Sequence, residues 1–356
     1  MRPRHRRLSG PRAAVVAVLA AAVCVAAAGC GGSDAQPKDV VLVTHDSFAV
    51  SKSVKRAFEQ ETGLTLRILQ GGDANETLNK ALLTAGDPQG DVIFGIDDSI
   101  LSRALDGDLL DEYRSPKLSA LEPDFSSPDP HVTPIDHGEV CLNVDRGWFA
   151  SHRIPPPTSL ADLVLDRYRN LLVVENPATS SPGLAFLLAT ISTFGDRWET
   201  YWRGLRANGV LAVDGWEEAY TQQFSGAAGS PGKRPIVVSY ASSPAAEVIF
   251  ASKKPSTAPT AAMEDGCYRQ VEYAGVLRGA HNADGAKKLI DFMLSERFQA
   301  DVPGSMFVYP VRSGVPLPEE FVKYAVVPKD PLQLSPEEID ANRDRWVARW
   351  TDIVVR

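Results

Sequence analysis

Residues 39–97 read DVVLVTHDSFAVSKSVKRAFEQETGLTLRILQGGDANETLNKALLTAGDPQGDVIFGID. Three short apolar runs in this stretch have the composition of buried strands, and they occupy residues 40–43, 64–69 and 91–96. The segments between them carry helical signals: Ser51 or Ser53 can cap a first helix that Gly63 ends, and residues 77–85 follow a helical pattern. Alternating strands and helices predict an α/β fold with a mainly parallel sheet.

A second α/β series follows an extended segment at residues 134–144. Its expected strands are residues 170–174, 210–213, 235–240 and 271–277, and its expected helices are residues 182–194, 216–224, 244–251 and 284–294. A last amphipathic helix starts after Ser335. Two series joined by extended segments predict two lobes with a ligand-binding cleft. The predicted lobes are discontinuous, with residues 39–135 and 268–310 in lobe 1 and residues 136–267 and 311–356 in lobe 2.

The N-terminus has the features of an export signal. Several arginines precede an apolar run at residues 13–28, which is short for a membrane-spanning helix. The run ends in AAGC, which resembles a bacterial lipobox, although Ala27 stands where Leu is usual. We expect residues 1–30 to be a signal peptide with a lipobox, Cys30 to be lipidated, and residues 31–38 to tether the protein to the extracytoplasmic face of the membrane. Ordinary cleavage that yields a soluble secreted protein is the alternative.

The charge and the cysteines narrow the set of partners. Without the five arginines of the leader the net charge falls from −8 to about −13, which argues against nucleic acid and is compatible with a cationic ligand. Cys141 and Cys267 remain in a compartment where disulfides persist. They either pair or stay as two buried thiols. A monomer is expected.

No enzyme signature is present. The chain lacks a P-loop, a G-x-S-x-G elbow, an H-E-x-x-H motif and a dinucleotide glycine pattern, and its histidines lack metal-ligand spacing. We therefore expect no catalytic residue, no metal and no cofactor. Instead, polar and aromatic residues gather in six turns at expected strand ends: residues 44–48, 95–99, 176–183, 214–220, 239–244 and 304–310. Each turn alone can be a helix cap, but together they predict one shared cleft.

The side chains of these turns indicate the kind of ligand. Thr179, Ser180 and Ser181 precede a helix, a position that suits a phosphate or a hydroxyl group. Asp46 and Asp97 can balance a positive charge. Flat faces for an aromatic or cationic ring come from Trp216, Tyr240 and Phe307. The ligand-binding candidates are His45, Asp46, Ser47, Asp97, Thr179, Ser180, Ser181, Trp216, Tyr220, Tyr240, Phe307 and Tyr309. The chemistry predicts a small, partly aromatic, cationic ligand.

The same turns resemble those of the periplasmic thiamine-binding proteins of ABC importers, over residues 40–356. The resemblance is carried, in order, by THDSF (44–48), DVIFGIDDS (91–99), NPATSSPGL (176–184), DGWEEAY (214–220), VVSYASSPA (237–245), YRQVEYAGVLRGA (268–280) and FVYPV (307–311). It implies the two-lobed type II periplasmic-binding-protein fold, which closes on its ligand by a hinge motion. It also implies thiamine or a thiamine phosphate as the transported ligand, and the permease and ATPase of an importer as partners.

The resemblance also assigns roles to residues. It implies that Trp216 and Tyr240 contact the ligand, that Ser180 lies near its phosphate or hydroxyl end, and that Asp97 lies near its ring system. Relatives commonly carry Tyr, Trp and Tyr where this chain has His45, Phe307 and Ala246. The last of these differences removes one aromatic face from the expected pocket.

Two other functions stay open at this stage. The first is a receptor for another small cation, such as a polyamine or iron(III), although iron receptors on this fold commonly use adjacent tyrosines and Tyr240 has none beside it. The second is a thiaminase-like enzyme with Cys141 as nucleophile and Glu139 as its carboxylate. A disulfide between Cys141 and Cys267 would exclude the enzyme.

Overall fold

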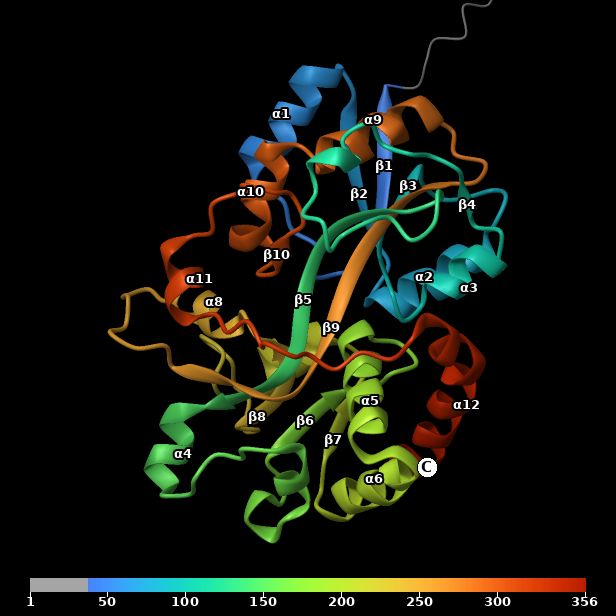
Figure 1. The fold of residues 1–356 in the computed structure, drawn as a ribbon. Helices are drawn as coiled ribbons and strands as arrows, with labels where there is room; N and C mark the ends of the chain where they lie inside the picture. The colour runs from blue at the N-terminus through green and yellow to red at the C-terminus, as the bar shows by residue number, and fades with distance from the viewer. Residues whose placement is uncertain (1–37) are drawn as a thin grey trace, which may run out of the picture. The chain divides into compact units, whose positions relative to one another are not determined.

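The computed structural model describes residues 38–356 (Figure 1). The predicted signal peptide, Cys30 and the tether up to residue 37 lie outside the described residues. The strands are β1 (Asp39–Thr44), β2 (Thr65–Gln70), β3 (Val92–Asp97), β4 (Leu110–Asp111), β5 (Thr133–Asp145), β6 (Leu172–Glu175), β7 (Leu211–Val213), β8 (Ile236–Tyr240), β9 (Thr260–Leu277) and β10 (Tyr309–Pro310). The helices are α1 (Lys52–Thr62), α2 (Ala74–Leu83), α3 (Leu101–Asp106), α4 (Arg146–His152), α5 (Ser181–Phe194), α6 (Trp198–Ala207), α7 (Trp216–Glu218), α8 (Ser243–Ile249), α9 (Ala283–Met293), α10 (Glu296–Ser305), α11 (Glu319–Tyr324) and α12 (Pro336–Val354).

All of these strands belong to one sheet. Its order is β2-β1-β3-β9-β5-β8-β6-β7, with β10 paired to β5 and β4 paired to β9. The outer strands form two parallel groups, β2-β1-β3 and β8-β6-β7. Between them, β9 and β5 are antiparallel to each other and to their outer neighbours. In Figure 1 these two long strands run side by side from one group to the other.

The expectation of a mainly parallel sheet is therefore wrong for the centre of the sheet. The extended segment at residues 134–144 is strand β5, and the expected strand at residues 271–277 is only the end of β9, which begins at Thr260. Both strands enter the sheet against the direction of their neighbours. Strand direction depends on the path of the connecting chain, which apolar composition does not encode.

Local capping signals explain several helix ends. The Ser51 side chain accepts a hydrogen bond from the backbone N–H of Val54 at the start of α1. Gly63 ends that helix in the left-handed region at φ 69°, where a glycine avoids the steric cost of a side chain. The Ser335 side chain caps α12 in the same way as Ser51, so the predicted starts of these two helices are confirmed.

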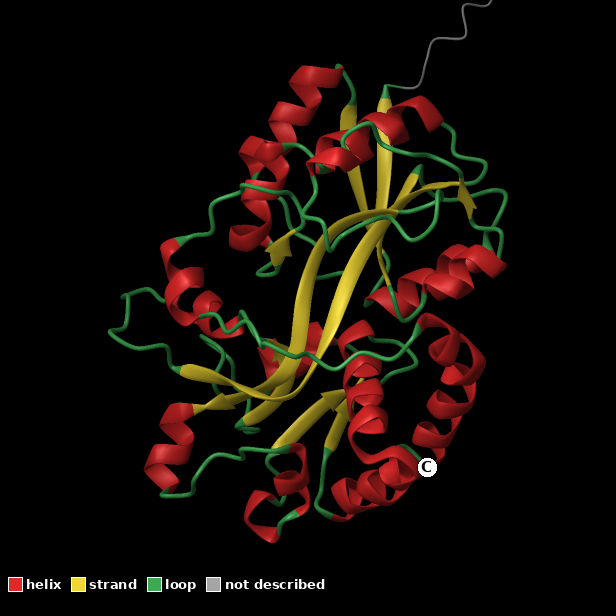
Figure 2. Ribbon diagram, viewed as in Figure 1, coloured by secondary structure: helices red, strands yellow, loops and turns green. Residues whose placement is uncertain are grey.

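Two large hydrophobic clusters support the two parallel groups. One packs α1, α9 and α10 against β1 and β3 through residues such as Phe58, Leu289 and Phe298. The other packs α5, α6 and α12 together, and in it the Trp202 and Trp350 rings meet edge to face at 5.5 Å. Figure 2 shows helices beside the strands of both groups. The lobe boundaries given above stay a prediction.

Within residues 38–356, no helix has the length and apolar character needed to cross a bilayer.

Candidate ligand-binding site

A cavity of about 350 Å³ lies beside the ends of β1 and β8. Its walls come from the turn after β1, the first residues of α7, the segment 219–223, α8, β9 and the residues that follow α10. Small-molecule sites typically have volumes of about 300–1,000 Å³. The cavity is therefore large enough for one small ligand.

One wall is made of three aromatic rings. Trp216 and Tyr220 are stacked, with ring centroids 5.1 Å apart, and the Tyr240 ring lies 6.5 Å from Trp216. The indole N–H of Trp216 donates to the Ser239 hydroxyl at 2.9 Å, which fixes the plane of the ring. Such a wall offers flat faces to an aromatic or cationic ligand.

A glycine on the neighbouring strand makes room for this wall. Gly138 of β5 lies directly against Tyr240, and a Cβ atom at position 138 would come within 2.8 Å of the ring. A larger residue at this position would collide with the ring unless the ring moved.

A second group of apolar side chains lies at the rim. The rings of Phe307 and Phe250 meet edge to face at 4.8 Å, and both line the cavity. Phe307 has φ 59°, an uncommon conformation for a residue with a side chain, and its carbonyl accepts a hydrogen bond from the Ser242 hydroxyl. The small side chain of Ala246 lines the cavity beside them.

The charged side chains that line the cavity are acidic. Glu217, Glu247 and Glu272 reach it, and no lysine or arginine is among the described residues of its lining. Glu247 accepts hydrogen bonds from the Tyr220 hydroxyl and the Ala228 N–H, both at 2.8 Å. Burial raises the pKa of Glu247. A cation would find favourable charge here, whereas an anion would not.

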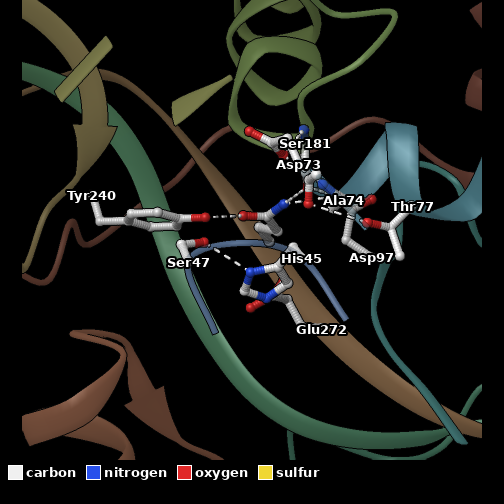
Figure 3. Close-up of polar contacts among 11 residues, drawn as sticks. His45, Ser47, Asp73, Ala74, Thr77, Asp97, Ser181, Tyr240 and Glu272 are labelled. Atoms are coloured by element: carbon white, nitrogen blue, oxygen red, sulfur yellow. Dashed lines mark hydrogen bonds and ion pairs between the residues drawn. The ribbon is translucent and has the colours of Figure 1, made fainter. Parts of the chain in front are cut away.

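His45 does not offset this acidity. Its Nε2 atom lies 3.6 Å from Glu272, and its Nδ1 atom lies 2.8 Å from the Ser47 hydroxyl (Figure 3). Burial lowers the pKa of His45 to about 4, so the ring is neutral near pH 7. A neutral imidazole would not repel a cationic ligand.

Behind Tyr240 a chain of hydrogen bonds runs away from the cavity. The Tyr240 hydroxyl donates to the Gln270 side-chain oxygen at 3.1 Å, and the Gln270 amide donates to Asp97 at 2.6 Å. Asp97 also accepts from the Ser99 hydroxyl and from the Ser181 hydroxyl, the latter seen in Figure 3. Asp97 is fully buried and does not line the cavity.

The turn before α5 also lies outside the cavity lining. The Ser180 hydroxyl accepts from the Gly183 N–H as the helix cap, the Ser181 N–H donates to Asp73, and the Thr179 hydroxyl donates to the Asp214 carbonyl. The sequence predicted that these groups bind a phosphate or a hydroxyl of the ligand. In the structure they form hydrogen bonds with other groups of the protein instead. Their contact with a ligand stays a prediction.

The cavity thus brings together six of the predicted residues: His45, Ser47, Trp216, Tyr220, Tyr240 and Phe307. The other six do not line it. Four of these, Asp97, Thr179, Ser180 and Ser181, are bonded within the protein as described above. Asp46 is exposed on the turn after β1, and Tyr309 is buried against Phe321 and His137.

Sequence reasoning did not name several residues of the lining as ligand contacts, and the most telling of these are Phe250, Glu247 and Glu272. Glu272 had a signal, because it is an acidic residue inside the apolar strand segment VEYAGVL. A buried carboxylate in such a strand is rare outside functional sites.

Cys141 and Cys267 form a disulfide between β5 and β9. Both residues are buried in a small cluster with Ala241, and neither lines the cavity. Across residues 38–356, no group of three or more His, Cys, Asp or Glu side chains is arranged to hold a metal ion.

Known proteins with similar sequences and structures bind solutes. The thiamine-binding periplasmic protein of Salmonella typhimurium is 29% identical over 321 residues, which cover 89% of this chain and 94% of the relative. A solved structure of a periplasmic thiamin binding protein matches with a TM-score of 0.80 and 28% identity, covering 91% of this chain and 98% of the other.

A more distant structure shows the fold alone. The periplasmic binding protein AfuA of Actinobacillus pleuropneumoniae, solved with fructose-6-phosphate, matches with a TM-score of 0.72 and 18% identity, covering 89% of this chain and 99% of the other. Together these structures give the chain the two-lobed type II fold of periplasmic binding proteins. The model of the family described as bacterial extracellular solute-binding protein matches residues 87–333, and the chain belongs to that family.

Proposed function

We propose that the protein binds thiamine, or a thiamine phosphate, outside the cytoplasmic membrane and delivers it to the permease and ATPase of an ABC importer. The observation that carries this proposal is the cavity itself. It has a wall of three aromatic rings, and the charged side chains among its described lining residues are all acidic. Thiamine presents an aminopyrimidine ring and a thiazolium ring with a fixed positive charge. Aromatic faces and carboxylates are the protein groups that suit such a ligand.

The names of the relatives support the same ligand. Several relatives that match this chain over most of their length are named thiamine-binding periplasmic proteins. Six candidates from the sequence, including Trp216 and Tyr240, lie around the cavity where such a ligand would bind.

We propose binding without catalysis. The thiaminase alternative needs a free thiol at Cys141, but the Cys141 sulfur is joined to Cys267 and lies away from the cavity. Incubation with thiamine and an amine, followed by a search for released pyrimidine, tests this point; turnover would contradict it.

We also propose export and attachment by lipid at Cys30, on the basis of the leader and its lipobox-like end. A periplasmic location of the relatives is consistent with export. Mass spectrometry of the mature N-terminus tests the attachment, since an unmodified terminus would rule out the lipid.

Titration calorimetry with thiamine tests the proposed ligand. Thiamine should bind and quench tryptophan fluorescence, and Trp216→Ala should weaken binding at least tenfold, about 1.4 kcal/mol or more. Trp148→Ala is the matched control, because Trp148 stacks on His152 and does not line the cavity. Absence of thiamine binding by the wild-type protein would overturn the proposal, and equal affinities of both variants would remove Trp216 from the site.

A further inference from the structure

Three carboxylates lie side by side across the central strands of the sheet. Glu272 of β9 is paired in register with Asp97 of β3 on one side and with Asp136 of β5 on the other. All three side chains are buried. Acidic residues directly opposite each other in a sheet repel when they are ionised. This row therefore destabilises the fold unless some of the carboxylates are protonated or have hydrogen-bond donors or cations beside them.

The compensation is unequal. Asp97 accepts hydrogen bonds from the Ser99 N–H and hydroxyl, the Ser181 hydroxyl and the Gln270 amide. Among the described residues, Asp136 has no hydrogen-bond partner other than the carboxyl group of Glu272. Apart from Asp136, Glu272 lies close to His45, whose Nε2 atom is 3.6 Å away. Asp97 thus accepts four hydrogen bonds, whereas Asp136 and Glu272 have no comparable set of donors.

No cation among the neighbouring groups neutralises the pair. His45 is neutral near pH 7, as argued above, and Arg269, on the same strand as Glu272, is paired with Glu139 at 3.2 Å. The titratable groups that surround the pair on the packed elements are His45, Asp73, Asp97, Asp98, His137, Glu139 and Tyr240.

These surroundings favour the protonated forms. Burial, and then the nearby carboxylates of Asp136, Asp97 and Asp73, raise the pKa of Glu272 well above its usual range. Burial likewise raises the pKa of Asp136, to about 7, while its hydrogen bond with Glu272 lowers it. In the empty protein the pair therefore holds at least one proton near neutral pH.

Glu272 differs from the other two acids because it lines the cavity. We propose that Asp136 and Glu272 form a proton-holding pair that gives up one proton to solvent when a cationic ligand occupies the cavity beside Glu272. The site then exchanges one positive charge for another, so its net charge stays constant and the cost of burying a lone charge is avoided. The carboxylate of Glu272 is left to face the bound cation. This inference rests on the proposed function, because it takes thiamine as the cation.

Calorimetry of the wild-type protein measures the proton directly. Thiamine is titrated near neutral pH in two buffers with different heats of ionisation, and the dependence of the observed heat on the buffer gives the number of protons released. We expect a release that approaches one proton per ligand, and an affinity that rises with pH by up to about tenfold per pH unit. Binding with no proton release and no pH dependence would overturn the inference and leave the proposed function intact.

Variants assign the proton to the pair. In Asp136→Asn the contact surface of the cavity is unchanged, because Asp136 does not line it. Asp136 then no longer raises the pKa of Glu272 through its charge and its hydrogen bond, so Glu272 ionises more readily. The proton release and the pH dependence should therefore fall by at least half. Glu272→Gln removes the carboxylate that faces the cation, and thiamine affinity should fall at least tenfold.

Glu175→Gln is the matched control. Glu175 is a buried carboxylate with both oxygens unpartnered and a pKa raised by burial, but it does not line the cavity. Its replacement should leave the proton release unchanged. If Glu175→Gln abolishes the proton release while Asp136→Asn retains it, the proton does not come from Asp136 and Glu272, and the inference is overturned. Near-ultraviolet circular dichroism checks that each variant is folded. A protein that binds no thiamine at all would instead contradict the proposed function.

Discussion

Phe250 stands at the rim of the cavity with 62% of its surface exposed. It follows α8 directly, and its N–H donates to the carbonyl of Ala246 at 2.9 Å, so the two residues lie one turn apart. Single exposed hydrophobic side chains are common on proteins and need no explanation alone. This one also packs against Phe307 and lines the cavity beside Ala246, the position at which the family resemblance leads us to expect an aromatic residue. We infer that Phe250 supplies the missing face.

Replacement of Phe250 by Ala should weaken thiamine binding by about three- to tenfold, because one aromatic contact is worth about 0.5–1.5 kcal/mol. Titration calorimetry measures the change. Leu83→Ala serves as the control, since Leu83 is 86% exposed and lies outside the cavity. Wild-type affinity in Phe250→Ala would show that the ring does not touch the ligand.

The sequence predicted the surroundings of the cavity in part. The strand-end turns point to the edge of the sheet where the cavity lies, and Trp216, Tyr240 and His45 line it. The depth of a side chain within that edge was not predictable. Asp97 and Ser181 sit behind the cavity because they bond to Gln270, a partner from a distant part of the chain. Spacing along the sequence carries no information on such long-range partners.

At the level of helices and turns, the start of α2 joins segments that are distant in sequence. Asp73 accepts hydrogen bonds from the N–H groups of Trp216 and Ser181, at 2.9 and 3.2 Å. Asn75 donates to the carbonyls of Pro177 and Ser180, and the Glu76 N–H donates to the carbonyl of Thr179. The first turn of α2 therefore holds the turns that precede α5 and α7. One of these turns positions Trp216 in the aromatic wall.

Asp73→Ala should destabilise the protein by about 1–3 kcal/mol, because it leaves backbone N–H groups without their acceptor in a buried setting. Urea denaturation followed by circular dichroism measures the change. Asp87→Ala is the control, since Asp87 is an exposed acid that follows the same helix. A loss no larger than that of the control would mean that water replaces the carboxylate.

Element boundaries were predictable where a cap is local and less so where packing sets them. Ser335 marked the start of α12 correctly. The segment 216–224 was expected as one helix, but it is the short α7 followed by a π-helical turn at Ala219–Gln223 that buries Tyr220. A π-turn is a tertiary adjustment, often found at functional sites, and residue propensities do not signal it.

For the protein as a whole, the α/β class and the order of most elements followed from the sequence, whereas the centre of the sheet did not. Strand β5 is buried along nearly all of its length, so it lacks the alternation that marks a half-exposed strand. Its partner β9 comes from a segment more than a hundred residues away in the chain. Pairing over such a distance is decided by the packed structure.

The unbroken course of β5 and β9 has a consequence for how the protein melts. The two strands share one hydrogen-bonded ladder and a disulfide while they contribute to both hydrophobic clusters, so neither end of the sheet can lose order without exposing the other. Heating residues 38–356 should give a single cooperative transition, with equal calorimetric and van't Hoff enthalpies in a scanning experiment. Two resolved heat-absorption peaks would contradict this expectation. A destabilising substitution near α12 should then lower the melting temperature by the same amount whether the temperature is measured with a probe near α1 or with a probe near α12.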